Sequence, residues 1–182
     1  MSVTRQRLLE ILEDSYTAYY NIIKEDLPSE LPIVFRADYF KRTESYWLSK
    51  SITIYGNEEN EYAYVFSAPE FSQEVIEKCF EYALSDGLPR VKPHKEHQVT
   101  NIKAVFVADS FEDGALKAVQ KKKFSKSYHL SLWGYTDLLA CAVIPESEEV
   151  YTNRAGQAQA AYFKKLLSAE AKNQKKLSAV DR

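Results

Sequence analysis

The sequence predicts an α+β fold: a single domain in which about four helices pack on one mixed or antiparallel sheet. Apolar residues recur at helical spacing in four segments, and segments with the alternating or unbroken apolar patterns of strands lie between them. The predicted order is helix, three strands, helix, strand, helix, three strands, helix, which makes two three-stranded meanders plus one strand. No linker or internal repeat divides the chain, so we expect one domain over residues 1–168.

The first third of the chain predicts a helix and an antiparallel meander. Thr4 is placed to cap a helix whose apolar stripe runs from Leu8 to Ile23, and Pro28 ends it. We expect this tyrosine-rich helix to pack on the sheet or on a copy of itself in a dimer. Short polar turns then separate three strands, and the last of these turns is Gly56–Asn60. The predicted strands cover Ile33–Lys41, Tyr46–Tyr55 and Tyr62–Ser67.

A second helix, a loop and a buried strand come next. Pro69 opens the helix, an apolar stripe spaced by four residues follows, and Gly87 ends it. Leu88–Thr100 contains two prolines and several basic residues, so we expect an exposed loop of a length that is uncommon without a function. Ile102–Ala108 is almost entirely apolar and predicts a buried strand.

The third helix leads into the second meander. Ser110 and Asp113 are spaced as a helix cap and an acidic N3 residue, and the helix is expected to end near Lys122. The strands that follow are Tyr128–Trp133 with period-two alternation, Leu138–Ile144 with an apolar run that suits a strand covered on both faces, and Val150–Thr152.

The last helix and the C-terminal segment complete the chain. Asn153 is placed to cap a helix with a clear apolar face. Residues 169–182 have too little apolar content to pack, so we expect a frayed or disordered basic tail.

The composition bounds the class of protein. A chain of 182 residues with 45% hydrophobic content can bury a full core, and its net charge of −2 with a pI of about 6.0 gives no global signal for nucleic acid. The cysteines Cys79 and Cys141 lie in apolar runs and suggest neither a disulfide nor a zinc site. We see no signal peptide and no stretch long enough to span a bilayer. We therefore expect a cytoplasmic protein with no membrane partner.

The histidine loop is the first candidate for chemistry. His94 and His97 are close enough to share a metal, but a catalytic zinc needs about three protein ligands. The third would have to be His129, Asp109 or Asp137, and the sequence cannot show that they converge. The other interpretations are a solvated polar loop and an anion site. The anion site would use Arg90, Lys92 and Lys95 beside either histidine.

Basic and aromatic residues also meet further along the chain. The lysines of residues 121–126 precede Tyr128 and Trp133, a combination that single-stranded nucleic-acid platforms use. Lysines in a last helical turn are equally ordinary complements to the helix dipole, and no RNA-binding motif accompanies them. His129 with neighbouring serines and Asp137 does not predict a hydrolase triad, because no G-x-S-x-G nucleophile elbow is present.

The leading hypothesis is a non-enzymatic binding or interaction module without a cofactor or metal. Its partner would be a protein or a small anionic ligand, with nucleic acid less favoured. The alternatives are a metal-dependent hydrolase or nuclease that uses the His94/His97 loop and nearby acids, and a homodimer formed through the first helix. The candidate ligand-binding residues are Arg90, Lys92, His94, Lys95, His97, Tyr128, His129, Trp133, Tyr135 and Asp137.

Three segments carry a resemblance to a known family: KPHKEH at Lys92–His97, FSKSYHLSLWGYTD at Phe124–Asp137 and VYTNRAG at Val150–Gly156. Together they resemble a family of uncharacterised bacterial domains of unknown function, over roughly Ile33–Phe163. The resemblance implies a bacterial, cytosolic protein. It implies no activity, ligand or catalytic residue.

Overall fold

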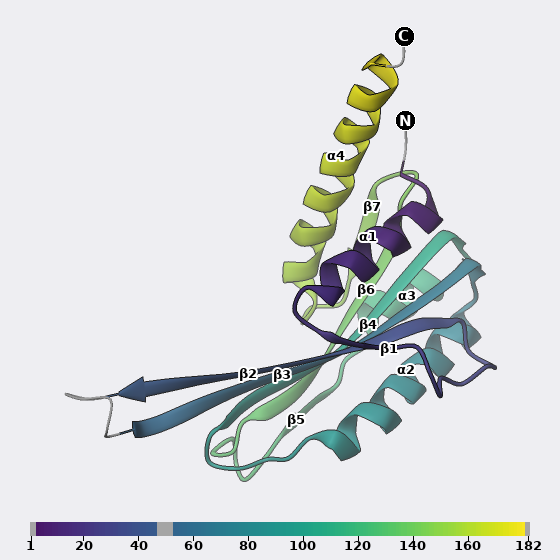
Figure 1. Ribbon diagram of the computed structural model, residues 1–182. Coiled ribbons are helices and arrows are strands. Elements are labelled where there is room, and N and C mark those ends of the chain that lie inside the picture. The colour runs from purple at the N-terminus through teal and green to yellow at the C-terminus, as the bar shows by residue number, and fades with distance from the viewer. Residues whose placement is uncertain (1–2, 47–52, 181–182) are drawn as a thin grey trace.

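A seven-stranded mixed sheet forms the middle layer of the molecule (Figure 1). The computed structural model describes residues 3–46 and 53–180. The strand order is β1-β2-β3-β4-β6-β5, and β7 pairs with the same edge of β6 as β5 does. The strands are β1 (Asn21–Ile23), β2 (Ile33–Tyr46), β3 (Thr53–Phe71), β4 (His97–Phe111), β5 (Ser125–Ser127), β6 (Tyr135–Ile144) and β7 (Glu149–Thr152).

Helices cover both faces of this sheet. The helices are α1 (Arg5–Thr17), α2 (Gln73–Gly87), α3 (Ala115–Lys121) and α4 (Gln157–Val180), and the 3₁₀ turn η1 (Leu88–Arg90) follows α2. Helices α1 and α4 share one apolar core with the sheet, and α2 and α3 share the other. The prediction of a single α+β domain with about four helices is confirmed. None of these helices is long and apolar enough to cross a membrane.

The strand directions follow from the connections. Strands β1, β2 and β3 form an antiparallel meander, whereas β3, β4 and β6 run parallel to one another. Parallel neighbours need a crossover, and α2 and α3 provide the two crossovers on the same face. The central strands are therefore covered on both sides. In β4, Val105 faces α1 and α4 while Phe106 faces α2 and α3, and both are fully buried.

The first helix is shorter than its apolar stripe predicts. It ends at Thr17 rather than at Pro28, and the chain then turns into β1, which pairs with β2. Leu8 and Leu12 of α1 are buried against the sheet of the same chain. Tyr19, expected in the stripe, is 78% exposed because it lies in the turn after the helix.

Two long strands replace the three that the sequence predicts over residues 33–67. Strand β2 runs to Tyr46, and Gly56–Asn60, expected as a turn, belongs to β3. The polar residues there are tolerated because they pair across the hairpin, as Arg42 does with Glu58 in the β2–β3 register. Part of the strand predicted over Tyr46–Tyr55 falls on residues 47–52, outside the described residues.

The boundaries of α2 and α3 also differ from the prediction. Pro69 is still in β3, and Ser72 caps α2 by accepting a hydrogen bond from the Val75 amide at 3.3 Å. The predicted end of α2 at Gly87 is confirmed. Ser110 lies inside β4, and α3 is preceded by Gly114, whose φ of +93° makes the turn.

The second predicted meander is only partly formed. The buried strand over Leu138–Ile144 and the short strand over Val150–Thr152 are confirmed within β6 and β7. The prediction of a strand over Tyr128–Trp133 is wrong. The chain forms the short strand β5 just before these residues, and the residues themselves form a turn. Asn153 stands before α4 rather than at its cap. Its amide bonds to the backbone of β6 at both Leu138 and Ala140.

Helix α4 continues well past residue 168, where the sequence predicts a frayed tail, and runs to Val180. Ala171 is buried, and the Arg7 guanidinium of α1 donates to Glu170 at 2.8 Å. These two contacts hold the first turn beyond Ser168 against the domain.

Candidate functional site

Three segments meet where β4 and β6 begin. They are the loop before β4, the turn before β6, and the polar part of the β2–β3 hairpin. The Glu58 amide donates to the Glu96 carbonyl at 2.8 Å, and His97 bonds to Trp133 at 2.7 Å. We call residues 91–98 and 128–137 the histidine end of the sheet. It contains nine of the ten candidate residues, all except Arg90.

His97 is a buried structural residue rather than part of an exposed loop. It is 3% exposed, and its Nδ1 lies 2.7 Å from the Trp133 carbonyl oxygen. A carbonyl can only accept, so Nδ1 carries the hydrogen and Nε2 accepts from the Thr100 hydroxyl at 2.9 Å. The Tyr128 ring packs edge-on at 5.9 Å. Both ring nitrogens are therefore occupied.

His94 lies nearer the surface and faces the hairpin. Its Nδ1 accepts from the Glu96 amide at 3.2 Å, so its Nε2 donates to Glu58 at 2.8 Å. Arg42 of β2 contacts both of these acids, at 3.7 Å for Glu58 and 2.9 Å for Glu96. Glu58 and Glu96 are thus matched by cationic or donor groups of the protein itself.

The three histidines do not converge. The rings of His94 and His97 are 6.4 Å apart, and His129 instead stacks on Trp133 with the ring centroids 4.7 Å apart. Within residues 3–46 and 53–180, no three His, Cys, Asp or Glu side chains are grouped so that they could hold a metal ion. The metal-dependent alternative has no supporting ligand cluster in this part of the chain.

The turn at residues 128–134, which we call the exposed turn, has an unusual backbone. His129, Leu130 and Ser131 have φ values of 49°, 54° and 67°, a left-handed conformation that costs roughly 1 kcal/mol or more per non-glycine residue. Backbone hydrogen bonds from Leu132 to His129 and from Trp133 to Tyr128 close it. As a result Leu130 is 94% exposed and Leu132 is 70% exposed, although the sequence places both on a buried face.

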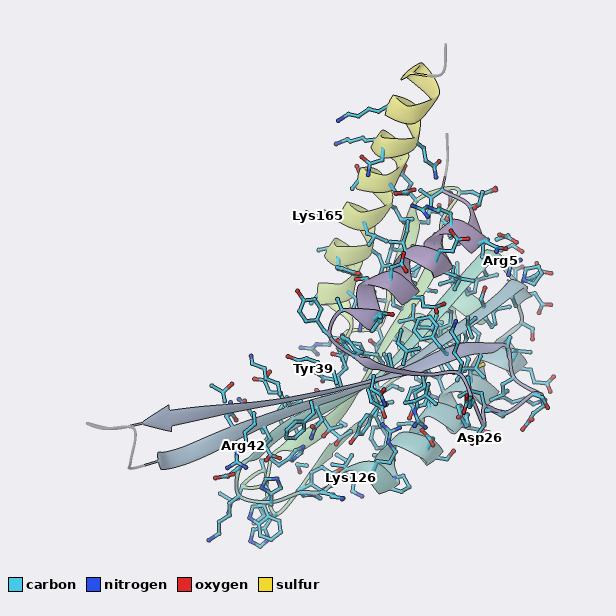
Figure 2. All side chains as sticks on the ribbon, in the orientation of Figure 1. Arg5, Asp26, Tyr39, Arg42, Lys126 and Lys165 are labelled. Carbon is cyan, nitrogen blue, oxygen red and sulfur yellow. The ribbon has the colours of Figure 1, made fainter. Side chains whose placement is uncertain are left out.

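Exposed cationic side chains precede both β4 and the exposed turn. Lys92 and Lys95 are exposed, and the described residues contain no acid paired with either. Lys126 lies with its amino group 5.4 Å from the Tyr128 ring. Figure 2 shows Lys126 and Arg42 at this end of the molecule, far from Lys165 on α4.

The remaining candidates at this end are less prominent. Tyr135 is 41% exposed at the start of β6, and Asp137 is half-buried, opposite Ser125 of β5. The Tyr128 hydroxyl lies 3.0 Å from that of Thr136 and anchors the turn to β6.

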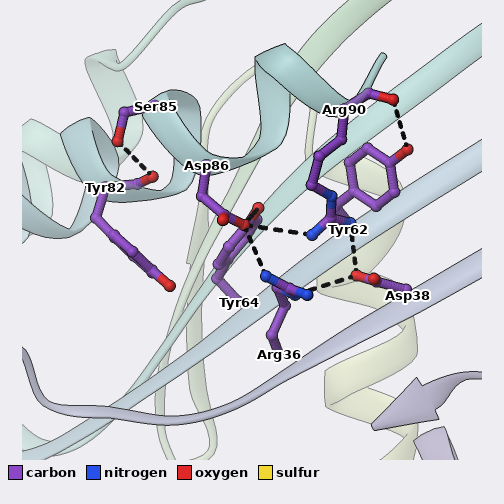
Figure 3. Close-up of polar contacts among 8 residues, drawn as sticks. All are labelled: Arg36, Asp38, Tyr62, Tyr64, Tyr82, Ser85, Asp86 and Arg90. Carbon is purple, nitrogen blue, oxygen red and sulfur yellow. Dashed lines mark hydrogen bonds and ion pairs between the residues drawn. The ribbon is translucent and has the colours of Figure 1, made fainter. Parts of the chain in front are cut away.

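Arg90 belongs to a different cluster, shown in Figure 3. Its guanidinium bonds to Asp38 at 2.7 Å and to Asp86 at 3.3 Å, and it lies 3.7 Å above the centre of the Tyr62 ring. Burial lowers the pKa of Arg90, but the hydrogen bond to Asp38 and the neighbouring acids raise it on balance above its ordinary value. The Arg90 guanidinium is therefore already paired with acidic residues of the protein itself.

Asp86, at the end of α2, joins the members of this cluster. It accepts from Arg36 at 3.0 Å and from the Tyr64 hydroxyl at 2.6 Å. Burial, and then the hydrogen bond to Asp86, raise the pKa of Tyr64. Arg36 Nε also lies 3.4 Å from Asp38, near enough for an ion pair but not aligned as a hydrogen bond. The cluster fastens the end of α2 to β2 and β3.

Comparison with known proteins assigns a family but no activity. Residues 4–165 match the model of a family described as Domain of unknown function (DUF8052). The chain belongs to the DUF8052 family. No curated protein and no solved structure matches it. The resemblance to a family of unknown function is thereby confirmed, while a bacterial origin stays a prediction.

In this DUF8052 domain, nine of the ten residues that the sequence singles out lie at one end of the sheet, but the sequence does not predict the exposure of Leu130 and Leu132. Leu130 and Leu132 alternate with polar residues as a strand does, which hides them in the pattern. The sequence feature that indicates a turn here is the nearby Gly134, whose φ is +74°. A Cβ there would lie 2.4 Å from the Gln98 carbonyl oxygen, so this close approach requires glycine.

Proposed function

We propose that this DUF8052 domain is a non-enzymatic binding module that holds an acidic, apolar segment of a protein partner at the histidine end. The observation that carries the proposal is the exposed turn, which presents Leu130 and Leu132 to solvent on a backbone that hydrogen bonds hold in place. Exposed leucines on a defined turn are typical of interaction sites, since burying them against a partner is favourable.

Charge supports the choice of an acidic partner. Lys92 and Lys95 are exposed in the loop before β4, and Lys126 is exposed in β5 just before the turn. Glu58 and Glu96 are matched by His94 and Arg42. Uncompensated positive charge at the rim steers an acidic segment toward the site, and the leucines supply the buried contact.

The aromatic residues support the same surface. His129 and Trp133 stack with an angle of 25° between their planes, which gives the turn a flat side beside the leucines. Aromatic residues are frequent anchors in protein interfaces because they bury a large area at a small cost in side-chain entropy. We also propose a cytoplasmic location. The free, buried thiols of Cys79 and Cys141 support it.

The test is selection of peptides from a displayed library of random sequences on the wild-type protein. We expect the enriched peptides to combine Asp or Glu with Leu, Ile or Phe, and to bind more weakly as salt is raised. Replacing Leu130 and Leu132 together by serine should weaken the best peptide at least about tenfold, since it removes the apolar contact. Replacing Lys92 and Lys95 by serine should lower its association rate and its salt dependence.

The matched control replaces Lys164 and Lys165, two exposed lysines of α4, by serine. This variant should bind like the wild type. Enriched peptides without acidic residues, or equal binding by the Leu130/Leu132 variant, would contradict the proposal. Binding of single-stranded oligothymidine that depends on the same residues, with no enriched peptide, would assign the surface to nucleic acid instead.

A further inference from the structure

Two adjoining pockets lie beside α3. The first, of about 580 Å³, lies between the start of α2 and α3. The second, of about 500 Å³, lies between the segment after α3, the start of β6 and the link from β7 to α4. Lys122 and Lys123 line both pockets, so the two adjoin. We call them together the lysine groove. Each volume is within the range of small-molecule sites, which is roughly 300–1,000 Å³.

The lysine groove is basic in a chain whose net charge is −2. Its charged lining residues are five bases and two acids, which give a local net charge of +3: Lys117, Lys121, Lys122, Lys123 and Arg154, with Glu77 and Asp137. A concave surface with an excess of one sign of charge concentrates ions of the opposite sign. The groove therefore favours an anion.

One of the five bases is matched by an acid of the groove itself. The Lys122 ammonium bonds to Glu77 at 2.5 Å. The other four bases are exposed, and their side chains make no ion pair or hydrogen bond with any residue that the structure describes. Lys117 and Lys121 are four positions apart on α3, a spacing at which like charges repel. An anion bound between them would relieve this repulsion.

A buried asparagine holds the two sides of the second pocket together. Asn153 is 1% exposed, and its amide nitrogen donates to the carbonyl oxygens of Lys122 at 3.0 Å and of Leu138 at 2.8 Å. Its Oδ1 accepts from the Gly156 amide at 2.8 Å. The backbone next to Arg154 is thereby fixed beside a segment that lies 31 positions earlier in the chain. Because the protein has already ordered this backbone, a ligand does not have to order it.

The lining indicates which class of anion suits the lysine groove. Its one aromatic lining residue, Phe124, is half-buried and packs against the core, whereas Tyr128 and Trp133 belong to the histidine end. Single-stranded nucleic acid needs exposed rings on which its bases stack, so the groove offers charge without that second contact. Lysine binds phosphate as a point charge. A single phosphate cannot lie in both pockets, whereas a chain of linked phosphates can follow the groove.

We propose that the lysine groove binds condensed phosphate, the chemistry that inorganic polyphosphate shares with the triphosphate group of nucleotides. The unpaired bases contact the phosphate oxygens, and Lys123 lies where the two pockets adjoin. The inference does not depend on the function proposed for the histidine end. The two surfaces share Asp137 alone, and this acid is not one of the groups that bind the anion.

The experiment is calorimetric titration of the full chain with inorganic triphosphate, at low salt and without divalent metal. We expect a Kd below about 100 µM, at least about tenfold weaker binding of orthophosphate, and a loss of affinity as salt is raised. ATP, titrated in the same way, distinguishes the two sources of the ligand. Binding as tight as that of triphosphate identifies a nucleotide as a source, and markedly weaker binding identifies inorganic polyphosphate. Both outcomes support the proposal.

The diagnostic variant is Lys121→Gln/Lys123→Gln, which removes two unpaired charges and leaves the pair of Lys122 and Glu77 in place. We expect triphosphate to bind at least about tenfold more weakly. The midpoint of thermal unfolding of the free protein should not fall, since repulsion on α3 is relieved. Residues with a merely structural role would lower that midpoint when replaced.

Two control variants separate this site from the rest of the surface. Lys164→Gln/Lys165→Gln removes the same charge from two exposed lysines of α4 and should bind triphosphate like the wild type. Lys92→Ser/Lys95→Ser, which alters the histidine end, should also bind it normally. Failure of the function proposed there would therefore leave this result unchanged.

A readout on the wild-type protein does not depend on any variant. The backbone amide NMR signals of residues 121–124 and 153–156 should shift on addition of triphosphate, and those of residues 128–134 should not. The proposal is overturned by a wild-type protein that does not bind triphosphate or by equal binding of the Lys121/Lys123 variant. It is also overturned if a hexa-aspartate peptide or oligothymidine binds as tightly as triphosphate through these same two lysines.

Discussion

The Nδ1 atom of His97 lies 2.7 Å from the carbonyl oxygen of Trp133, and this hydrogen bond ties the start of β4 to the end of the exposed turn. The same ring accepts from Thr100 through Nε2. His97 thus bridges two segments that lie far apart in the sequence, and it fixes the position of the leucines at the tip of the turn.

Replacing His97 by alanine should destabilise the protein more than any other change at the histidine end. It removes a buried ring and leaves the Trp133 carbonyl and the Thr100 hydroxyl without their partner. We expect the free energy of unfolding in urea to fall by about 2–4 kcal/mol. Changes in Trp133 fluorescence should show that the turn has moved.

The matched control is His94→Ala. The side chain of His94 is 42% exposed, and its hydrogen bonds are only partly buried. We expect a loss of less than about 1 kcal/mol. Equal losses for the two histidines would contradict the structural role assigned to His97.

Asp86 should prove more important than its place at the end of α2 suggests. Asp86→Ala removes the shared acceptor of Arg36, Arg90 and Tyr64 and leaves two half-buried guanidinium groups around one remaining acid, Asp38. We expect a loss of about 2–3 kcal/mol in the free energy of unfolding.

The comparison for this prediction is Asp113→Ala, since Asp113 is exposed in the loop before α3. Its replacement should change the free energy of unfolding by no more than about 0.5 kcal/mol. A similar small change for Asp86→Ala would mean that the cluster in Figure 3 contributes little to stability.

The sequence predicts the parts of this fold in which one pattern has one physical explanation. Leu138–Ile144 is apolar at every position because both faces of β6 are covered, and a helix of that length would not suit its flanking turns. Gly87 likewise predicts where α2 ends, although it does not form a left-handed cap: its φ is −75°, and the chain continues into the 3₁₀ turn η1.

The errors arise where distant contacts decide the structure. The polar stretch Gly56–Asn60 stays extended because β2 and β4 pair with it on either side. His97 is buried by Trp133, which lies 36 positions later in the chain. Neither partner can be inferred from a window of neighbouring residues.

The sequence also gives no direct sign of the cavity of about 460 Å³ between α1, α4 and the sheet, although two residues that line it leave a trace. Glu61 stands at the start of the apolar stretch of β3, Lys103 interrupts that of β4, and the register pairs Glu61 with Asn101, two residues before Lys103. Gln159, which also lines this cavity, gives no such signal, because a glutamine early in a helix is ordinary until its surroundings are known.

The cysteines lead to a prediction about alkaline pH. Burial raises the pKa of the Cys79 thiol from an ordinary 9.0 to about 12, and burial also raises that of Cys141. Between these values the unfolded chain loses thiol protons that the folded chain keeps, so the folded state binds more protons. The free energy of unfolding should therefore fall as the pH rises above about 9.

Thiolate absorbance near 240 nm provides the measurement, because it should titrate only well above pH 9 in the native protein and near pH 9 in urea. The double variant Cys79→Ala/Cys141→Ala should show a shallower fall of stability over this pH range. Thiolate formation near pH 9 in the native protein would mean that the thiols are accessible.

The contacts of α4 beyond residue 168 lead to the last prediction. A chain that ends at Ser168 loses the burial of Ala171 on the α1 side of the sheet, and it loses the ion pair between Arg7 and Glu170. We expect the midpoint of thermal unfolding to fall by about 2–4 °C, the effect of about 1 kcal/mol of lost apolar burial. A chain that ends at Gln174 keeps both contacts and should unfold at the wild-type temperature. If both truncated chains unfold at that temperature, the segment from residue 169 adds nothing to the domain, and the boundary at residue 168 expected from composition alone is the correct one.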